Sequence, residues 1–333
     1  MSPGNESFVY GSELFGRGDP TQTDQIVGSA IFSLALCALI LGCYNIYVIK
    51  KMKIFHNAFG WFWASRTIGE MGSNLVHVIY SGPLTILQYN VFPPWAGITA
   101  FTFGYFFACH ACVMHQVVSV NRMLAVCMPI RYRFIFTKKI CKILIAMCWV
   151  EVFFVLAAYL VFPCNVVGYS PTLYEYVFVK CEAGLERDYS IVGTFVNRFC
   201  FVVCFLTMLS DVVTLVKIIQ IKKSGLQRKN FSRDVRFFCQ TSVQNMTMMI
   251  ALTLIVLVNN STSEDGLILQ IFAFCTLIVT HLNNALALII FNPEVRGRFT
   301  GKSYNSSANG MEHSHRVAPT KSGEELWTTH SKS

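Results

Sequence analysis

Residues 121–132, NRMLAVCMPIRY, follow a long apolar run and end it with a charge. The apolar run covers residues 96–121, and a helix needs about 20 mostly apolar residues to cross a lipid bilayer. Arg122 is costly to hold in hydrocarbon, so it marks the place where the helix meets the membrane surface. The stretch therefore predicts one end of a transmembrane helix, with Pro129 and Tyr132 in the connection that follows.

Similar apolar segments lie on both sides of this one. The chain has 333 residues, of which 53% are hydrophobic and 14% charged, with a mean hydropathy of +0.48, which is too apolar for an ordinary soluble protein. Short connections leave no room for a separate catalytic domain, so we do not expect an enzyme. The fold class predicted is an all-α membrane protein, a seven-transmembrane helix bundle, whose spans are 26–49, 58–81, 96–121, 140–163, 189–216, 237–258 and 267–291.

The distribution of Lys and Arg predicts the orientation of the bundle. With the N-terminus outside and the C-terminus inside, the inner regions hold 22 of the 27 Lys and Arg and the outer regions only three, namely Arg17, Lys180 and Arg187. Basic residues concentrate on the cytoplasmic side of membrane proteins. The net charge of +9 therefore reflects topology and contact with anionic membrane lipid, and not binding of nucleic acid.

These boundaries divide the chain into three parts. We expect an extracellular N-terminal segment at 1–25, a seven-transmembrane receptor domain at 26–296 and a disordered cytoplasmic tail at 297–333, which is rich in Ser, Thr, Gly and Asn. Asn5 and Asn260 begin glycosylation sequons on segments predicted to lie outside.

The order of residues after Arg122 resembles a known signature. Arg122, then Ala125-Val126, then Pro129-Ile130-x-Tyr132 resembles the R-Y-x-A-I-x-x-P-L-x-Y pattern of rhodopsin-like G-protein-coupled receptors. The longer run 121–137 is similar to nematode serpentine chemoreceptors of class X, and residues 281–296, HLNNALALIIFNPEVR, fit the same family. The resemblance covers roughly residues 26–296.

The resemblance implies a chemosensory receptor that transmits the binding of a small extracellular ligand to a heterotrimeric G protein. It implies a multi-pass protein of the plasma membrane, including the membrane of a sensory cilium, with arrestin and a receptor kinase as further partners. The cysteines and histidines are scattered, so we expect no metal site, and no cofactor is expected. Two other functions stay open, a channel or transporter and a non-signalling assembly protein. The odd number of spans and the lack of visible inverted repeats disfavour a transporter.

The resemblance assigns G-protein coupling to Asn121, Arg122, Pro129 and Tyr132. In the family the arginine holds the third and sixth helices together at rest, but here Asn121 replaces the usual acidic neighbour. The restraint could come instead from Asp234 or Asp211. The alternative is that Arg122 only extends its charge to the membrane surface.

A polar cluster inside the bundle is expected from Asn45, Glu70 and Asn284, which fall where the family places polar residues on its first, second and seventh helices. An acid within a span normally has a partner. Whether the cluster binds sodium or only packs the bundle stays open at this point. The Pro and Tyr of the family's seventh-helix element are replaced here by Ala285 and Leu288.

Aromatic side chains suggest where a ligand could bind. Apolar walls with a few polar groups suit a small-molecule pocket, and the outer halves of the third, fifth and seventh spans offer Phe101, Tyr105, Phe195, Arg198, Phe199, Phe272 and Phe274. With 28 Phe in the chain, ordinary core or lipid-facing packing is the competing interpretation for each ring. Arg198 could pair with an anionic ligand or with an acid of the outer loops.

Cysteines number 13, and most lie within spans, where they pack as small apolar side chains. The family usually ties the outer end of the third helix to the second outer loop, but the matching position here, near Gly97, has no cysteine nearby. Cys164 and Cys181 fall on that loop, where oxidation can occur. A disulfide within the loop is therefore expected.

Overall fold

The computed structural model describes residues 8–225, 231–259 and 266–301, without the side chains of 133, 231–234 and 259. The two candidate glycosylation sites, Asn5 and Asn260, and most of the predicted tail lie outside the described residues. Within these ranges, six helices are long and apolar enough to cross a membrane. They are α1 (Gln22–Lys51), α4 (Pro94–Cys127), α6 (Lys138–Val161), α7 (Ile191–Lys223), α8 (Phe231–Asn259) and α9 (Gly266–Phe291).

A more polar segment completes the seven. It consists of α2 (Ala58–Val76), a single π-helical turn η3 (His77–Ser81) and α3 (Gly82–Leu87), and it extends the predicted span 58–81 by six residues. Most side chains of α2 are buried between other helices, so α2 tolerates Arg66 and Glu70 where a lipid-facing helix would not. The predicted seven-helix bundle is confirmed.

Local sequence explains several helix starts. Thr21 and Asp24 form a capping box at the start of α1, in which each side chain binds the other residue's backbone N–H. Asn57 accepts a hydrogen bond from the backbone N–H of Gly60 at the start of α2, and Ser190 accepts one from Gly193 at the start of α7. Such caps satisfy N–H groups that have no partner within the helix.

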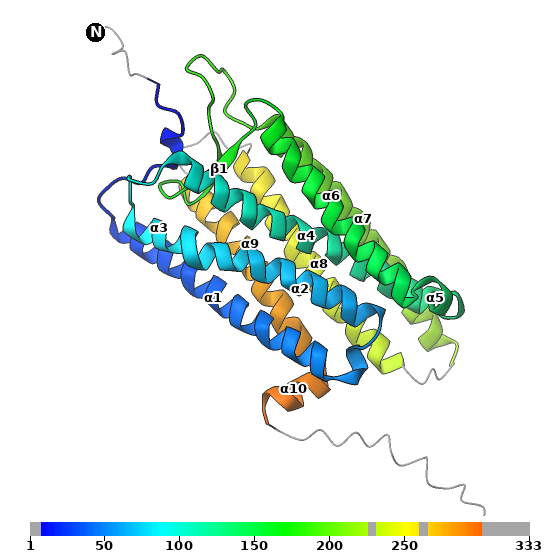
Figure 1. Ribbon diagram of the computed structural model, residues 1–333. Helices are drawn as coiled ribbons and strands as arrows, with labels where there is room; N and C mark the ends of the chain where they lie inside the picture. The colour runs from blue at the N-terminus through cyan, green and yellow to red at the C-terminus, as the bar shows by residue number, and fades with distance from the viewer. Residues whose placement is uncertain (1–7, 226–230, 260–265, 302–333) are drawn as a thin grey trace, which may run out of the picture.

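The helices form a closed bundle around α4 (Figure 1). α4 packs on α2, α6 and α7, and α9 closes the ring by packing on both α1 and α8. α2 and α4 approach closely because two glycines of α2 face α4. A Cβ atom at Gly69 would lie 2.8 Å from the backbone oxygen of Phe107, and one at Gly72 would overlap the Phe107 ring.

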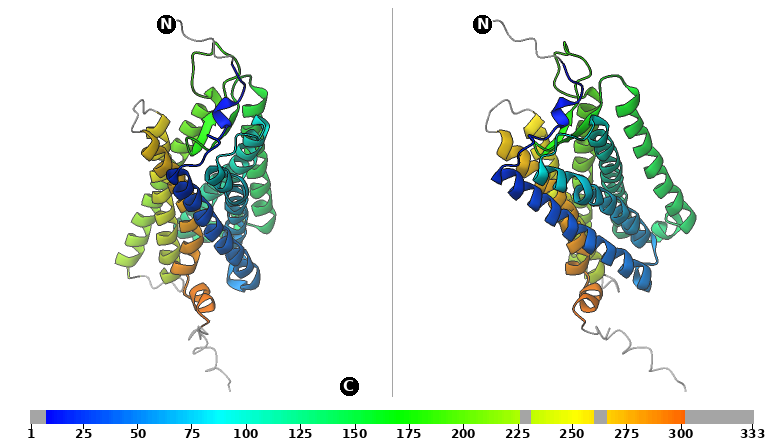
Figure 2. Two further views of the ribbon diagram at one scale, coloured as in Figure 1. Left: turned by 90° about the vertical axis from the view of Figure 1, so that its left-hand side faces the viewer. Right: turned by 60° about the vertical axis from the view of Figure 1, so that its left-hand side comes forward.

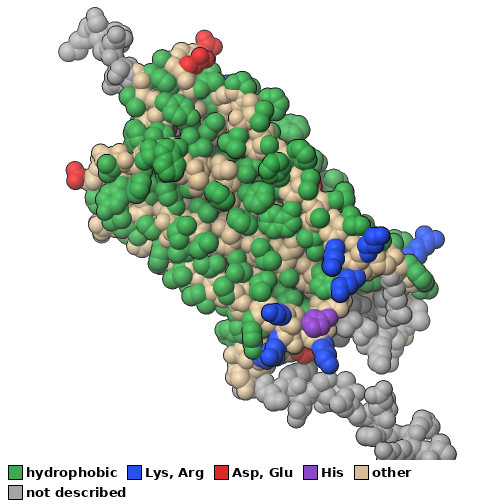
Figure 3. Space-filling view, viewed as in Figure 1, with side chains coloured by type: hydrophobic (Ala, Val, Ile, Leu, Met, Phe, Trp, Pro, Cys, Tyr) green, Lys and Arg blue, Asp and Glu red, His purple; other side chains and the backbone are tan. Residues whose placement is uncertain are grey.

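The two ends of the bundle differ in structure and charge. At one end, called here the hairpin end, lie residues 8–21 with the short helix η1 (Ser12–Leu14) and the antiparallel strands β1 (Val167–Ser170) and β2 (Glu175–Phe178). The other, called the basic end, carries η2 (Lys53–Phe55), α5 (Pro129–Ile135) and α10 (Pro293–Phe299), and Figure 2 shows α10 and the first described residues at opposite ends. Lys and Arg gather at the basic end, whereas the flank of the bundle is mostly hydrophobic (Figure 3).

Candidate functional site

Arg122 lies at the basic end of α4 between two aromatic rings. Its guanidinium carbon is 3.3 Å from the ring centroid of Phe59 on α2 and 4.0 Å from that of Phe237 on α8. The ring centroids lie 4.8 Å apart, and both side chains are buried. A guanidinium is attracted to the face of an aromatic ring, most strongly where water is excluded. Phe59 and Phe237, called here the aromatic clamp, thus connect Arg122 to α2 and α8.

The other predicted coupling residues lie next to Arg122 in the chain. Asn121 is buried, and its amide Nδ2 donates a hydrogen bond of 3.2 Å to the hydroxyl of Tyr132 on α5. Pro129 is the first residue of α5, where its missing N–H is not needed. Asn121 and Tyr132 therefore join the end of α4 to α5.

Asp211, one of the two acids considered as a restraint on Arg122, bonds to other polar side chains. It lies on α7 and accepts a hydrogen bond of 3.0 Å from the hydroxyl of Ser119 on α4 and another from the amide of Asn245 on α8. The oxygen of that amide contacts a ring nitrogen of His115 on α4. This network links α4, α7 and α8. The side chain of Asp234, the second acid, lies outside the described residues.

Glu70 and Asn284 meet in the interior of the bundle, as part of the predicted cluster. Glu70 Oε1 accepts hydrogen bonds of 2.8 Å from Asn284 Nδ2 and of 2.8 Å from Arg66 Nε. Arg66 and Glu70 are 2% and 5% exposed, and Arg66 also donates to Gln244 Oε1 at 3.1 Å. Asn45 instead donates to the backbone oxygen of Ala285 at 3.0 Å. The charge partner of Glu70 is thus Arg66, which sequence reasoning left out of the cluster although the two stand four residues apart on one helix.

Three of the predicted ligand residues gather near the hairpin end. Phe101 and Tyr105 of α4 stack with ring centroids 4.9 Å apart, and Phe274 of α9 lies across from Phe101, with the ring of Tyr176 between them. The remaining four candidates point outward and are not brought together with these rings. Among them Phe195, Phe199 and Phe272 are 70%, 51% and 65% exposed, and Arg198 is exposed as well.

Tyr176 of β2 is a residue that sequence reasoning missed. Its ring centroid lies 5.1 Å from that of Phe101, 5.5 Å from Phe274, 5.8 Å from Tyr169 and 6.3 Å from His77. We call these four rings around Tyr176 the aromatic cage. Tyr169 and Tyr176 stand on either side of a Pro-containing turn, a pattern typical of a β-hairpin, and in the hairpin the two residues are directly paired.

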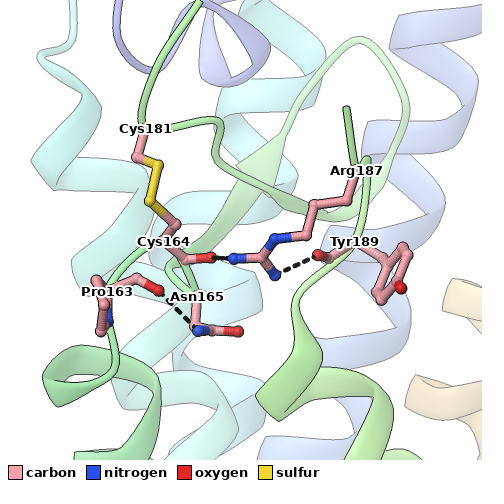
Figure 4. Close-up of a disulfide and its surroundings, with 6 residues drawn as sticks. All are labelled: Pro163, Cys164, Asn165, Cys181, Arg187 and Tyr189. Carbon is pink, nitrogen blue, oxygen red and sulfur yellow. Dashed lines mark hydrogen bonds between the residues drawn. A yellow bond between two sulfur atoms is a disulfide. The ribbon is translucent and has the colours of Figure 1, made fainter. Parts of the chain in front are cut away.

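A disulfide between Cys164 and Cys181 closes the base of the hairpin, as expected (Figure 4). The two Cα atoms are 5.4 Å apart, within the usual range for a disulfide. Arg187 donates a hydrogen bond of 2.5 Å to the backbone oxygen of Cys164 and another of 3.0 Å to that of Tyr189. Further into the bundle, the hydroxyl of Tyr169 bonds to Thr85 of α3 at 2.6 Å.

Residues 8–21 hold the tip of the hairpin against the bundle. The hydroxyl of Tyr174 donates to Asp24 at 2.6 Å, and Arg17 binds the same carboxylate at 2.5 Å and the backbone oxygen of Thr172 at 2.9 Å. Beside the tip, burial of the Glu175 carboxyl raises its pKa to about 7. The hairpin and the N-terminal segment thus form a lid over the aromatic cage.

A seven-helix bundle with a disulfide-closed lid over an aromatic cage and an arginine at the opposite end has the architecture of a G-protein-coupled receptor. The sequence pattern of one such family, described as "Serpentine type 7TM GPCR chemoreceptor Srx", matches residues 32–292. The chain is also similar to serpentine receptor class X 45 of Caenorhabditis elegans, with 22% identity over 300 residues, covering 82% of this chain and 80% of that one.

The chain therefore belongs to the Srx family of serpentine chemoreceptors. This confirms the predicted resemblance and a chemosensory G-protein-coupled receptor as the function, and it does not favour a channel or transporter. The family is one of multi-pass membrane receptors rather than enzymes, and it acts through small ligands and G proteins in general.

Proposed function

We propose that the hairpin end faces the outside of the cell, that a small ligand binds at Phe101, Tyr105 and Phe274, and that a heterotrimeric G protein binds at the basic end around Arg122. The concentration of Lys and Arg at the basic end supports this orientation. In this arrangement 26–296 is the receptor domain, residues before it are extracellular, and 297–333 form a cytoplasmic tail that receives a receptor kinase and arrestin. The plasma membrane of a sensory cilium suits a chemoreceptor.

The observation that carries the coupling mechanism is the aromatic clamp. Phe237 lies on α8, so any movement of the basic end of α8 away from α4 must separate its ring from Arg122. Such a contact is worth about 0.5–1 kcal/mol at an exposed site and about 2 kcal/mol when it is shielded from water. We infer that the clamp stabilises the resting receptor and that its opening presents the guanidinium to the G protein.

Variants of Arg122 and Phe237 test this mechanism through guanine-nucleotide exchange on a promiscuous G protein, measured at equal surface expression without added ligand. Arg122→Ala should abolish the receptor-dependent exchange. Phe237→Leu removes the ring but keeps an apolar side chain, and it should raise basal exchange about fivefold, the equivalent of about 1 kcal/mol. Phe62→Leu is the matched control, because this buried ring of α2 has its aromatic contact with Phe136.

Arg122→Lys tests whether Arg122 couples the receptor to the G protein or only extends its charge to the membrane surface. A lysine reaches the surface equally well but lacks the planar group that stacks on two rings. Normal exchange in both Arg122→Lys and Arg122→Ala would show that Arg122 does not couple the receptor to the G protein.

A further inference from the structure

We propose that Tyr176 is a built-in occupant of the ligand site, and that the ligand is a small neutral aromatic molecule that takes the place of this ring. The inference rests on the proposed function, because it assumes that Phe101 and Phe274 line the ligand site. It adds the chemical class of the ligand and the side chain that the ligand must displace.

The position of Tyr176 carries the first step. A residue of the lid reaches into the bundle and contacts rings of three helical segments, Phe101 of α4, Phe274 of α9 and His77 of η3. Phe101, Tyr105 and Phe274 are the predicted ligand residues that gather near the hairpin end. Two of them, Phe101 and Phe274, contact Tyr176. An incoming ligand that contacts Phe101 and Phe274 must compete with the Tyr176 ring.

The shape of the site favours an aromatic ring with a small polar group. Tyr176 meets Phe101 and Phe274 at interplanar angles of 70° and 68°, the edge-to-face geometry that aromatic pairs prefer. Its hydroxyl is buried next to Gly104 of α4, where a Cβ atom would lie 3.1 Å from the hydroxyl oxygen. Gly104 thus leaves room for a phenol-sized group.

The charges near the site favour a neutral ligand. The four residues of the aromatic cage carry no carboxylate that would neutralise a cation and no Lys or Arg that would bind an anion. The Arg17–Asp24 ion pair is held at the hairpin tip by Tyr174 and Thr172. Because a charged ligand would lose hydration without gaining a partner, a neutral one is favoured.

The hairpin can release Tyr176 without unfolding. All four residues of β1 are buried, whereas all four residues of β2, including Tyr176, keep partial exposure. The disulfide holds the base, and Tyr169 bonds to Thr85 from the buried strand. A swing of the Tyr176 side chain therefore leaves the anchors of the lid in place.

The test uses p-cresol, which is the tyrosine side chain without its backbone, and receptor purified in lipid nanodiscs. Tyr176→Ala should be destabilised, and p-cresol should raise its melting temperature with concentration and return its basal nucleotide exchange towards the wild-type value. Wild type should need at least about tenfold more p-cresol for any effect, since its own ring competes for the site. Tetramethylammonium, a cation that aromatic rings also bind, should have no effect on either receptor.

Gly104→Ala tests the same site without opening a cavity. The added methyl group should push the Tyr176 hydroxyl aside and change exchange in the same direction as Tyr176→Ala. The double variant Gly104→Ala/Tyr176→Phe lacks the hydroxyl and should behave like Tyr176→Phe alone. Phe62→Ala opens a cavity of similar size at the basic end and serves as the control for binding to any apolar cavity.

The proposal is overturned if p-cresol alters Phe62→Ala as it alters Tyr176→Ala, if Gly104→Ala shows wild-type exchange, or if tetramethylammonium acts in place of p-cresol. Failure of the proposed function gives a different result. If the Arg122→Ala receptor stimulates nucleotide exchange on the G protein like wild type, the proposed coupling through Arg122 is wrong. The melting temperature of Tyr176→Ala with p-cresol still reports whether a ring binds in place of Tyr176.

Discussion

Arg66 and Glu70 show how a charged pair is accommodated inside a membrane bundle. The guanidinium binds the carboxylate on the same helix, and the remaining hydrogen bonds go to Gln244 of α8 and Asn284 of α9. The pair therefore connects α2 to two further helices. Arg66 supplies the positive charge beside Glu70 that a sodium ion would otherwise supply, which supports the packing interpretation of this cluster.

Removal of one partner should destabilise the receptor strongly. Glu70→Gln keeps the size of the side chain but leaves Arg66 buried without a counter-charge, and such changes cost about 3–5 kcal/mol. We expect a markedly lower melting temperature in detergent. Arg66→Met/Glu70→Gln removes both charges and should recover much of the loss. If Glu70→Gln melts at the same temperature as the wild-type receptor, the ion pair does not contribute to stability.

For single residues, the sequence predicted the place along a helix better than the side chains that each residue contacts. Arg122 lies near the basic end of α4, which continues beyond it to Cys127, but nothing in the chain indicated that its guanidinium lies over the rings of Phe59 and Phe237. Contacts between helices depend on the rotation of each helix about its axis. With 28 Phe in the chain, a single sequence does not reveal which rings share a face with Arg122.

For whole helices the limit is the same: the sequence of α7 does not reveal which of its faces points into the bundle. Phe195 and Phe199 are four residues apart, so they share one face of the helix, yet that face points outward. In a soluble protein an aromatic face would indicate the core. In a membrane the outward face is apolar too, because it meets lipid, and therefore apolar periodicity does not distinguish inside from outside.

The disulfide should stabilise the hairpin as an element. Cys164 and Cys181 are 17 residues apart, and closing a loop of that length is worth about 3 kcal/mol on the chain-entropy model. Cys164→Ser/Cys181→Ser should therefore lower the melting temperature and speed proteolysis of the loop. Mass spectrometry of non-reduced peptides checks the pairing, and two free thiols in the wild-type receptor would contradict it.

The hairpin should also respond to pH through Glu175. Its pKa is raised to about 7 by burial, so the folded hairpin binds a proton more tightly than the unfolded chain does. The stabilisation is complete below the unfolded pKa of about 4.5 and is lost as pH rises through 7. The melting temperature should fall between pH 5 and 8, and Glu175→Gln, which stays neutral, should remove that dependence. If the melting temperature of Glu175→Gln falls between pH 5 and 8 as much as that of wild type, another group causes the pH dependence.

The charge asymmetry of the whole molecule predicts its orientation in the membrane. An epitope tag at the N-terminus should stain in intact cells, and one at the C-terminus only after permeabilisation, because Lys and Arg gather at the basic end. A tag in the loop between α4 and α6 provides an internal check on the same side as the C-terminus. Staining in the reverse pattern would place Arg122 outside and exclude coupling there.

Long, mostly apolar segments predicted the seven helices, including the more polar α2, because each span must hide its backbone from lipid within a single helix. The apolar segments did not predict that residues 8–21 pack onto the bundle, since that segment is short and polar. Leu14 is buried against Gly168, where a Cβ atom would lie 2.6 Å from the leucine methyl group, and Arg17 binds Asp24 and the backbone oxygen of Thr172. Such contacts depend on the finished bundle and leave no periodic pattern in the sequence.

The polar character of α2 has a consequence for how the chain is made. An arginine at the middle of a helix opposes transfer from the translocon into lipid by about 2.5–3.5 kcal/mol, and an acid acts in the same direction. α2 carries both Arg66 and Glu70, so it cannot partition into the bilayer alone as readily as the helix before it. We therefore expect α2 to insert stably only once α4, which places Phe107 against the two glycines of α2, has been synthesised. Substitutions on the α4 side of that contact should therefore reduce the yield of inserted receptor before they affect any response to a ligand.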